Sequence, residues 1–74
     1  MKWNELSSLG EAGIMHAYIE GGDFGVMGTP GKRDWRVVHA ADGVPVVEHE
    51  RHSYEDAVYC AENRQSWVDK EGTR

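Results

Sequence analysis

The dipeptide Asp42-Gly43 separates two runs that are rich in β-branched residues, and it constrains the fold more than any other feature of the chain. The first run is DWRVVHAA at 34–41, and the second is VPVVEHE at 44–50. Asp-Gly between apolar runs marks a β-hairpin, because glycine adopts the positive φ that a tight hairpin turn requires. Pro45 has no N–H to donate, so we expect it at a sheet edge or at a position without ladder hydrogen bonds.

The turn of this hairpin also predicts its register. If Gly43 closes a three-residue loop, Val37 lies opposite Val47, and Arg36 lies opposite Glu48 as a pair of unlike charges. Side chains alternate between the two faces of a strand. The face expected to pack in the core then holds Trp35, Val37, Val47 and His49.

A second hairpin is predicted upstream. Residues 13–20, GIMHAYIE, alternate loosely, so that Met15, Ala17 and Ile19 share one face. Gly21-Gly22-Asp23 then has the composition of a tight turn, and residues 24–28 form the returning strand.

The C-terminal segment has the pattern of a helix packed on one side. Ser53 is suited to the N-cap, Asp56 follows three residues later as in a capping box, and Gly72 supplies a stop. Glu55 and Asp56 in the first turn suit the helix dipole. The apolar residues at helical spacing are Tyr54, Ala57, Val58, Ala61 and Val68.

These elements predict an α+β fold in one domain, residues 1–74, because the chain is too short for two. We expect an antiparallel sheet of three to four strands, built from two hairpins, with the C-terminal helix on one face. Residues 3–9, WNELSSL, form either a short N-terminal helix or an irregular arm. The second sheet face stays open to solvent or to a partner.

Size and charge restrict the function. A chain of 74 residues buries only ~60% of its unfolded surface, so a surface is easier to build than a deep catalytic cleft, and we expect no enzyme. Thirteen acidic and eight basic residues give a net charge of −5, which argues against direct nucleic-acid binding and is compatible with a basic protein surface as partner. A single cysteine and no membrane-length apolar run predict a cytoplasmic protein that spans no membrane.

The stretch GVMGTPGKR at 25–33 has the glycines and the Gly-Lys of a phosphate-binding loop, but not its spacing. The motif requires glycine where Val26 stands, and Ser or Thr where Arg33 follows the lysine. Proline followed by glycine predicts instead a turn at residues 29–31. The basic residues near this turn could contact an anion or an acidic partner, and they are Lys32, Arg33 and Arg36.

Metal and covalent chemistry are not expected, and neither is a cofactor. The four histidines lack the paired spacing of a zinc motif, and two of them lie on separate predicted strands. Cys60 falls mid-helix beside the apolar stripe, and its neighbours Asp56 and Glu62 are acidic, so we do not expect it to act as a nucleophile. The histidines are His16, His39, His49 and His52.

Acidic residues gather around the last hairpin and the start of the helix. They form either an ordinary solvated face or a surface that docks on a basic groove of another macromolecule. An exposed tryptophan would add a hot spot to such a surface. The predicted partner-binding residues are Glu48, Glu50, Glu55, Asp56, Glu62 and Trp67.

The two hairpins, IMHAYIEGGDFGVMG and DWRVVHAADGVPVVEHE, followed by SYEDAVYCAENRQSWVDK, give a pattern that is similar to small phage-encoded accessory proteins, including anti-CRISPR inhibitors. The likeness is one of size, acidity and element order. It implies a non-enzymatic inhibitor, in the cytoplasm of a bacterial host, that occupies a basic site on a nucleic-acid-processing complex. The alternative is a housekeeping interaction module, a homodimer that pairs through the open sheet face or an edge strand.

Overall fold

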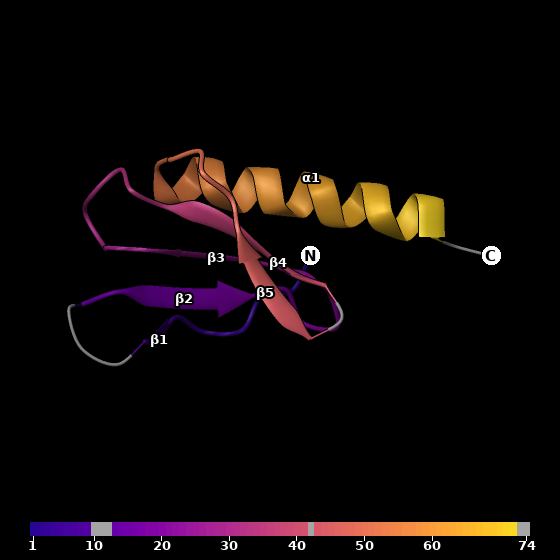
Figure 1. Ribbon diagram of the computed structural model, residues 1–74, viewed down its shortest axis with the longest axis horizontal. Helices are drawn as coiled ribbons and strands as arrows, with labels where there is room; N and C mark the ends of the chain where they lie inside the picture. Colours follow the sequence, from indigo (N-terminus) through magenta and orange to yellow (C-terminus); the bar gives the residue numbers. More distant parts are fainter. Residues whose placement is uncertain (10–12, 42, 73–74) are drawn as a thin grey trace.

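The computed structural model describes residues 1–9, 13–41 and 43–72. Within these residues the chain forms five strands and one helix, and the sheet order follows the chain order, each strand antiparallel to the next. The helix α1 lies across one face of the sheet (Figure 1). The elements are β1 (Ser7–Ser8), β2 (Met15–Tyr18), β3 (Phe24–Gly28), β4 (Arg36–Ala41), β5 (Val44–Val47) and α1 (Tyr54–Gly72).

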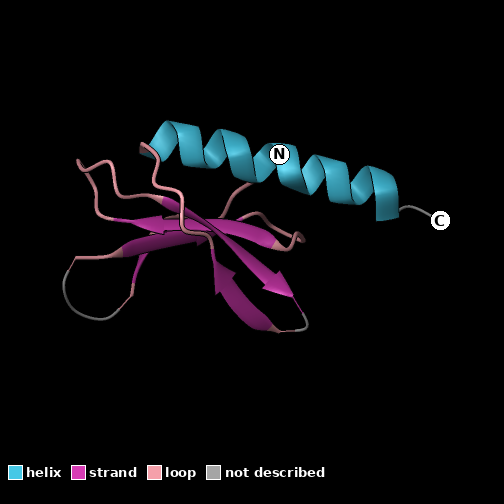
Figure 2. Ribbon diagram, turned by 45° about the horizontal axis from the view of Figure 1, so that its top comes forward, coloured by secondary structure: helices cyan, strands magenta, loops and turns pink. Residues whose placement is uncertain are grey.

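This architecture confirms the predicted α+β class with a helix on one sheet face, and β1 adds a short strand at one edge (Figure 2). The hairpin of β2 and β3 is also confirmed. Ala17 pairs with Val26, Gly21 has a φ of 73°, and Ile19 N donates to Phe24 O at 3.0 Å. Ala17 and Ile19 belong to the buried cluster that includes Ala57 and Ala61, so the core face expected for β2 is the face that α1 covers.

The turn between β4 and β5 differs from its prediction. Gly43 has the expected positive φ, at 79°, and Asp42 lies outside the described residues. Ala41 pairs with Val44, so two residues separate the strands rather than three. A two-residue loop with positive φ matches the twist of the strands better than the longer loop, which explains the tighter turn.

The shorter turn shifts the register by one residue and reverses the faces of β5. Val47 pairs with Val38 instead of Val37, and it lies on the sheet face away from α1. Glu48 N donates to Val37 O at 2.9 Å, so the predicted pairing of Glu48 with Arg36 is wrong. Because the side-chain period of a strand is two, a slip of one residue moves every side chain to the other face.

The core lies between α1 and the sheet face it covers. Its fully buried members include Trp35, Val26 and Val37, which pack beneath the helix. Of the residues predicted for the core face of the second hairpin, Trp35 and Val37 belong to this cluster, whereas Val47 and His49 are exposed. The buried cluster comprises Ala17, Ile19, Phe24, Val26, Trp35, Val37, Ala57 and Ala61.

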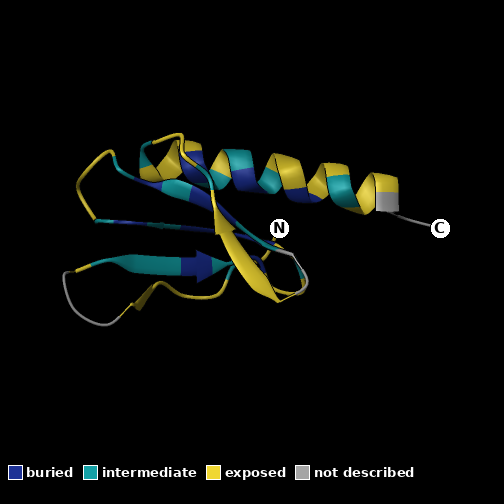
Figure 3. Cartoon of the chain, viewed as in Figure 1, coloured by how far each residue is buried: buried dark blue, intermediate teal, exposed yellow. Residues whose placement is uncertain are grey.

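Helix α1 begins as its sequence indicates. Ser53 Oγ accepts from Asp56 N at 3.2 Å, which confirms the N-cap. Ala57 and Ala61 are fully buried, because their small side chains let the helix lie close to the sheet. Buried and exposed residues alternate along α1 (Figure 3). Tyr54 packs edge-on against Trp35, with ring centroids 4.8 Å apart, and stays 40% exposed.

Residues 3–9 form an extended arm, so the helical alternative is wrong for this segment. Trp3 makes an antiparallel bridge with Ile19, and Asn4 Oδ1 accepts from Tyr18 N at 2.8 Å. These contacts continue the sheet past β2. Backbone groups of the arm therefore pair with β2 and the residues beside it rather than within a helix.

Gln65 is the buried polar residue that ties α1 to the β2–β3 turn. It is 3% exposed, and its Oε1 accepts from Asp23 N at 2.6 Å and from Phe24 N at 3.2 Å. Its Nε2 donates to Asp69 at 2.9 Å. A Cβ at Gly22 would lie 2.5 Å from Oε1, so a larger residue there would displace this amide. The helix is thus anchored at one turn by polar contacts as well as by apolar packing.

Strand β5 forms an edge of the sheet, and its apolar side chains are exposed. Val44 is 62% exposed and Val46 is 53% exposed. The bonded pair of Glu48 with Val37 fixes the alternation of the ladder, which places Pro45 at a non-bonded position. The prediction for Pro45 is therefore confirmed. Its nitrogen is on the outer side of the edge, where a donor would invite another strand.

Within the described residues, no helix has both the length and the apolar character that crossing a bilayer requires.

Candidate functional site

The six residues predicted to bind a partner do not form one acidic face. Glu48 follows β5 on the side of the sheet that α1 covers, and its carboxylate forms an ion pair with Arg64 of the helix. Both side chains are partly exposed, so this pair contributes at most about 1 kcal/mol. Arg64 neutralises the charge of Glu48 within the chain. Glu48 therefore attracts a basic partner less strongly than an unpaired carboxylate would.

Glu62 is also engaged within the chain. Its Oε2 accepts from Trp3 Nε1 at 2.7 Å, a contact that joins the extended arm to α1. The residue is half-buried. Glu62 therefore has a structural partner, although one carboxylate oxygen remains for other contacts.

The remaining three carboxylates lie around the N-terminal end of α1. Glu50 lies in the connection that precedes the helix, and Glu55 and Asp56 lie in the first helical turn. All three are exposed, and none has an ion pair among the described residues. Carboxylates at this end of a helix are stabilised by the helix dipole, so they carry charge here at little cost to folding.

Trp67 belongs to a row of exposed residues on α1 that are spaced four apart. We name the row Glu55, Tyr59, Asn63 and Trp67 the outer ridge. Residues four apart on a helix are neighbours on one face. Tyr59 is 68% exposed and Trp67 is 64% exposed, so the outer ridge places two large aromatic side chains in solvent beside acidic groups.

Tyr59 was not among the predicted binding residues. The signal that identifies it is its spacing, because Tyr59 follows Glu55 by one turn and precedes Trp67 by two. It also falls outside the apolar stripe that packs on the sheet. A tyrosine on the solvent side of a helix carries a large contact area and a hydroxyl group at low entropic cost, which suits an interface.

The predicted basic cluster is divided by the structure. Lys32 and Arg33 are exposed in the loop between β3 and β4. Lys32 N donates to Thr29 O at 3.1 Å, and Gly31 has a φ of 84°, which confirms the predicted turn there. Arg36 lies on β4, on the sheet face away from α1. It therefore belongs to a different surface from the two loop residues.

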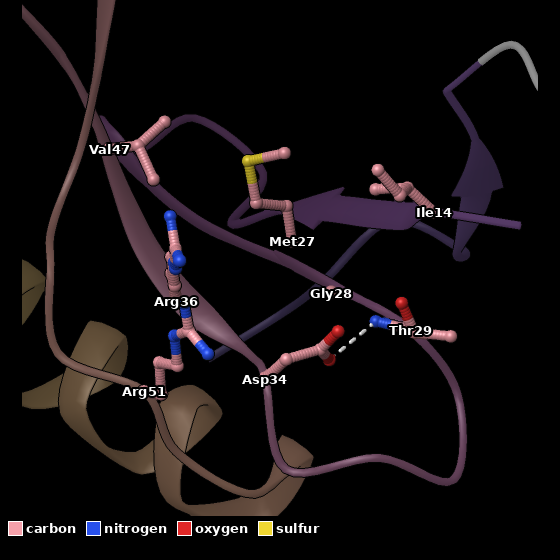
Figure 4. Close-up of a pocket in the computed structure, with 8 residues that line it drawn as sticks. All are labelled: Ile14, Met27, Gly28, Thr29, Asp34, Arg36, Val47 and Arg51. Carbon is pink, nitrogen blue, oxygen red and sulfur yellow. Dashed lines mark hydrogen bonds between the residues drawn. The ribbon is translucent and has the colours of Figure 1, made fainter. Parts of the chain in front are cut away.

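Arg36 lines a cavity of about 390 Å³ on that sheet face (Figure 4). Asp34 lies at the same cavity, and its Oδ1 accepts from Thr29 N at 2.9 Å. This backbone hydrogen bond lowers the pKa of Asp34 below its usual value. The lining residues are Ile14, Met27, Gly28, Thr29, Asp34, Arg36, Val47 and Arg51.

The described residues give no arrangement suited to metal binding, since no group of three or more His, Cys, Asp or Glu side chains converges among them. Cys60 is a half-buried free thiol that packs against the core cluster. His39 stacks on Phe24, with ring centroids 4.4 Å apart, and His52 pairs its backbone with Trp35. Cys60 and His39 therefore have packing roles.

Comparisons with protein-family models, with curated proteins and with solved structures find no match to this chain.

Proposed function

We propose that the protein is a non-enzymatic inhibitor that docks its outer ridge, with the neighbouring carboxylates, on a basic site of a bacterial nucleic-acid-processing complex. The observation that carries this proposal is the exposure of Tyr59 and Trp67 on one helix face beside Glu55 and Asp56. Tryptophan and tyrosine are enriched among the residues that dominate the binding energy of protein interfaces.

The charge of the molecule supports the same kind of partner. A net charge of −5 steers the chain toward a basic surface and away from nucleic acid itself. Sites that hold nucleic acid are basic, so a protein of this charge competes with nucleic acid for them. Glu50, Glu55 and Asp56 supply carboxylates that have no ion pair among the described residues.

The experiment is affinity capture from nuclease-treated bacterial lysate, followed by mass spectrometry and binding measurements with the purified complex. The test bait is Glu55→Lys with Asp56→Lys, and the matched control is Glu5→Lys with Glu20→Lys. Both control positions are exposed and lie outside the helix, and the two baits change net charge equally. We expect a nucleic-acid-processing complex to be captured by wild type and by the control, but not by the test bait.

Tyr59→Ala with Trp67→Ala provides a second test, because lysines in the first helical turn also oppose the helix dipole. These side chains are exposed, so we expect folding to be unchanged and affinity to fall by roughly 30-fold or more. Three results would contradict the proposal. The charge control could lose capture as fully as the test bait, the aromatic variant could keep its affinity, or the captured partners could be proteins that do not process nucleic acid.

A second candidate function is a self-associating interaction module. The exposed valines of β5, Val44 and Val46, favour it, since an apolar edge strand is a common site of chain pairing. Pro45 opposes it, because it removes an outward N–H from that edge. Sedimentation velocity over a wide concentration range distinguishes the two functions, since only the second requires a dimer.

A further inference from the structure

The cavity on the sheet face away from α1 is assembled from four separate parts of the chain. Its walls come from the approach to β2, from the end of β3 with the following loop, from β4, and from β5 with the connection to α1. Its volume of about 390 Å³ lies within the range of small-molecule pockets. We name it the arginine cavity, after Arg36 and Arg51, whose guanidinium groups both extend into it (Figure 4).

A bulge beside β5 brings Arg51 to this cavity. The ladder to β4 pairs Glu48 with Val37, and it resumes where His52 pairs with Trp35 through hydrogen bonds of 2.7 and 2.9 Å. Arg36 alone therefore faces residues 49–51 on the other strand. Bulges of this kind redirect side chains and are frequent next to functional sites. Here the extra residues place Arg51 next to Arg36.

The charges at the arginine cavity are not balanced. Neither the Arg36 guanidinium nor the Arg51 guanidinium has an ion pair or a hydrogen bond among the described residues. The carboxylate of Asp34 is held by the backbone N–H of Thr29 and not by either guanidinium. Two cations that share one cavity repel each other, and an anion placed between them removes that repulsion.

The remaining wall is apolar. Ile14, Met27 and Val47 line the cavity beside the two arginines, and Val47 is 38% exposed. A simple inorganic anion would leave this wall unused. A guanidinium group presents a planar fork that matches the two oxygens of a carboxylate.

We propose that the arginine cavity binds a carboxylate carried on an apolar group, with Arg36 and Arg51 holding the carboxylate and Ile14, Met27 and Val47 contacting the apolar part. The outer ridge lies on α1, which covers the other sheet face. This proposal therefore does not depend on the proposed function, and each can fail alone.

The test is a titration with N-acetyl-leucine, followed through the Arg Nε and methyl signals of the labelled protein by NMR. N-acetyl-leucinamide is the matched neutral probe. We expect saturable shifts at Arg36, Arg51, Met27 and Val47 with the acid, and at least 10-fold weaker binding of the amide, because charge-assisted hydrogen bonds are lost.

The variants are Arg36→Gln and Arg51→Gln, with Arg33→Gln as control. Arg33 is an exposed arginine of the adjacent loop that does not line the cavity, and its loss changes the net charge equally. We expect each cavity variant to weaken N-acetyl-leucine binding at least 10-fold and the control to leave it unchanged. Equal binding of the acid and the amide, no saturable shifts with either, or equal effects of all three variants would overturn the proposal.

Two further arms define the ligand. Inorganic phosphate that displaces N-acetyl-leucine with equal affinity would overturn the choice of an apolar carboxylate. A tetrapeptide with a blocked N-terminus and a free C-terminal leucine distinguishes the sources of the carboxylate. Binding 10-fold tighter than that of N-acetyl-leucine identifies the C-terminus of a peptide chain, and equal binding identifies a free small molecule.

Discussion

Replacing Gln65 with methionine isolates the contribution of its buried hydrogen bonds. Gln65 is 3% exposed, and its Oε1 accepts from the backbone N–H groups of Asp23 and Phe24. Methionine has similar length and volume, so it leaves little cavity and costs below about 1.5 kcal/mol in packing. The variant Gln65→Met therefore removes an acceptor while it keeps the apolar contacts of the helix.

The expected loss follows from the two donors that remain. The Phe24 N–H is buried, and leaving it without an acceptor costs about 1–3 kcal/mol. The Asp23 N–H is only partly buried and can bond to water instead, so losing its hydrogen bond to Gln65 adds less to the destabilisation. We expect Gln65→Met to lower the free energy of unfolding by about 2–3 kcal/mol. For a domain of this size that corresponds to a fall in Tm of roughly 10–20 °C.

The assay is urea denaturation combined with hydrogen exchange. Asn63→Met is the matched control, since it places the same side chain at an exposed position of the same helix and should change stability by less than about 0.5 kcal/mol. Hydrogen exchange of the Asp23 and Phe24 amides should accelerate in Gln65→Met by more than the loss of global stability alone would cause. A loss below about 0.5 kcal/mol with unchanged exchange would refute this account of how α1 is anchored.

Three further predictions concern other positions. A Cβ at Gly28 would lie 2.8 Å from the Cα of buried Trp35, so Gly28→Ala should destabilise the fold by about 1–3 kcal/mol in urea denaturation, and a neutral result would contradict the packing described. Pro45→Thr restores an outward N–H at the β5 edge, and we expect concentration-dependent association in sedimentation velocity, whereas a strictly monomeric variant would show that Pro45 does not protect this edge. The pKa of Asp34 is lowered in the fold by the N–H of Thr29, so its stabilising effect is present above the unfolded pKa and is lost as pH falls through the folded one. Wild type should therefore exceed Asp34→Asn in stability at neutral pH and converge with it in acid, and a difference independent of pH would refute this.

Local chemistry predicted most of the fold. The Gly21 and Gly43 turns, the Ser53 cap and the buried Ala57 and Ala61 each follow from the short stretch of sequence that surrounds them. The register of β5 did not follow, because Asp-Gly is compatible with both two-residue and three-residue loops, although the two-residue loop matches the strand twist better. The difference of one residue in loop length decides which face of the sheet Val47 occupies.

The surface features depend on contacts between distant segments, which the sequence does not display. In the sequence, Glu48 and Glu62 cannot be distinguished from Glu55 as candidate binding residues. In the fold, Glu48 forms an ion pair with Arg64, and Glu62 accepts a hydrogen bond from Trp3. In the sequence, Gln65 cannot be distinguished from other polar residues of the helix, because its role depends on its contact with the β2–β3 turn. The arginine cavity requires a bulge whose position no local pattern indicates.

The order of the strands has a consequence for how the chain folds. Each strand of the sheet pairs with its neighbour in sequence, so the ladders close short loops and cost little chain entropy before they gain contacts. The hydrogen bond from Trp3 to Glu62, by contrast, spans 59 residues. We expect the hairpins to form in the transition state and the Trp3 arm to close after α1 has docked, so that substitutions at Trp3 speed unfolding and leave the folding rate almost unchanged.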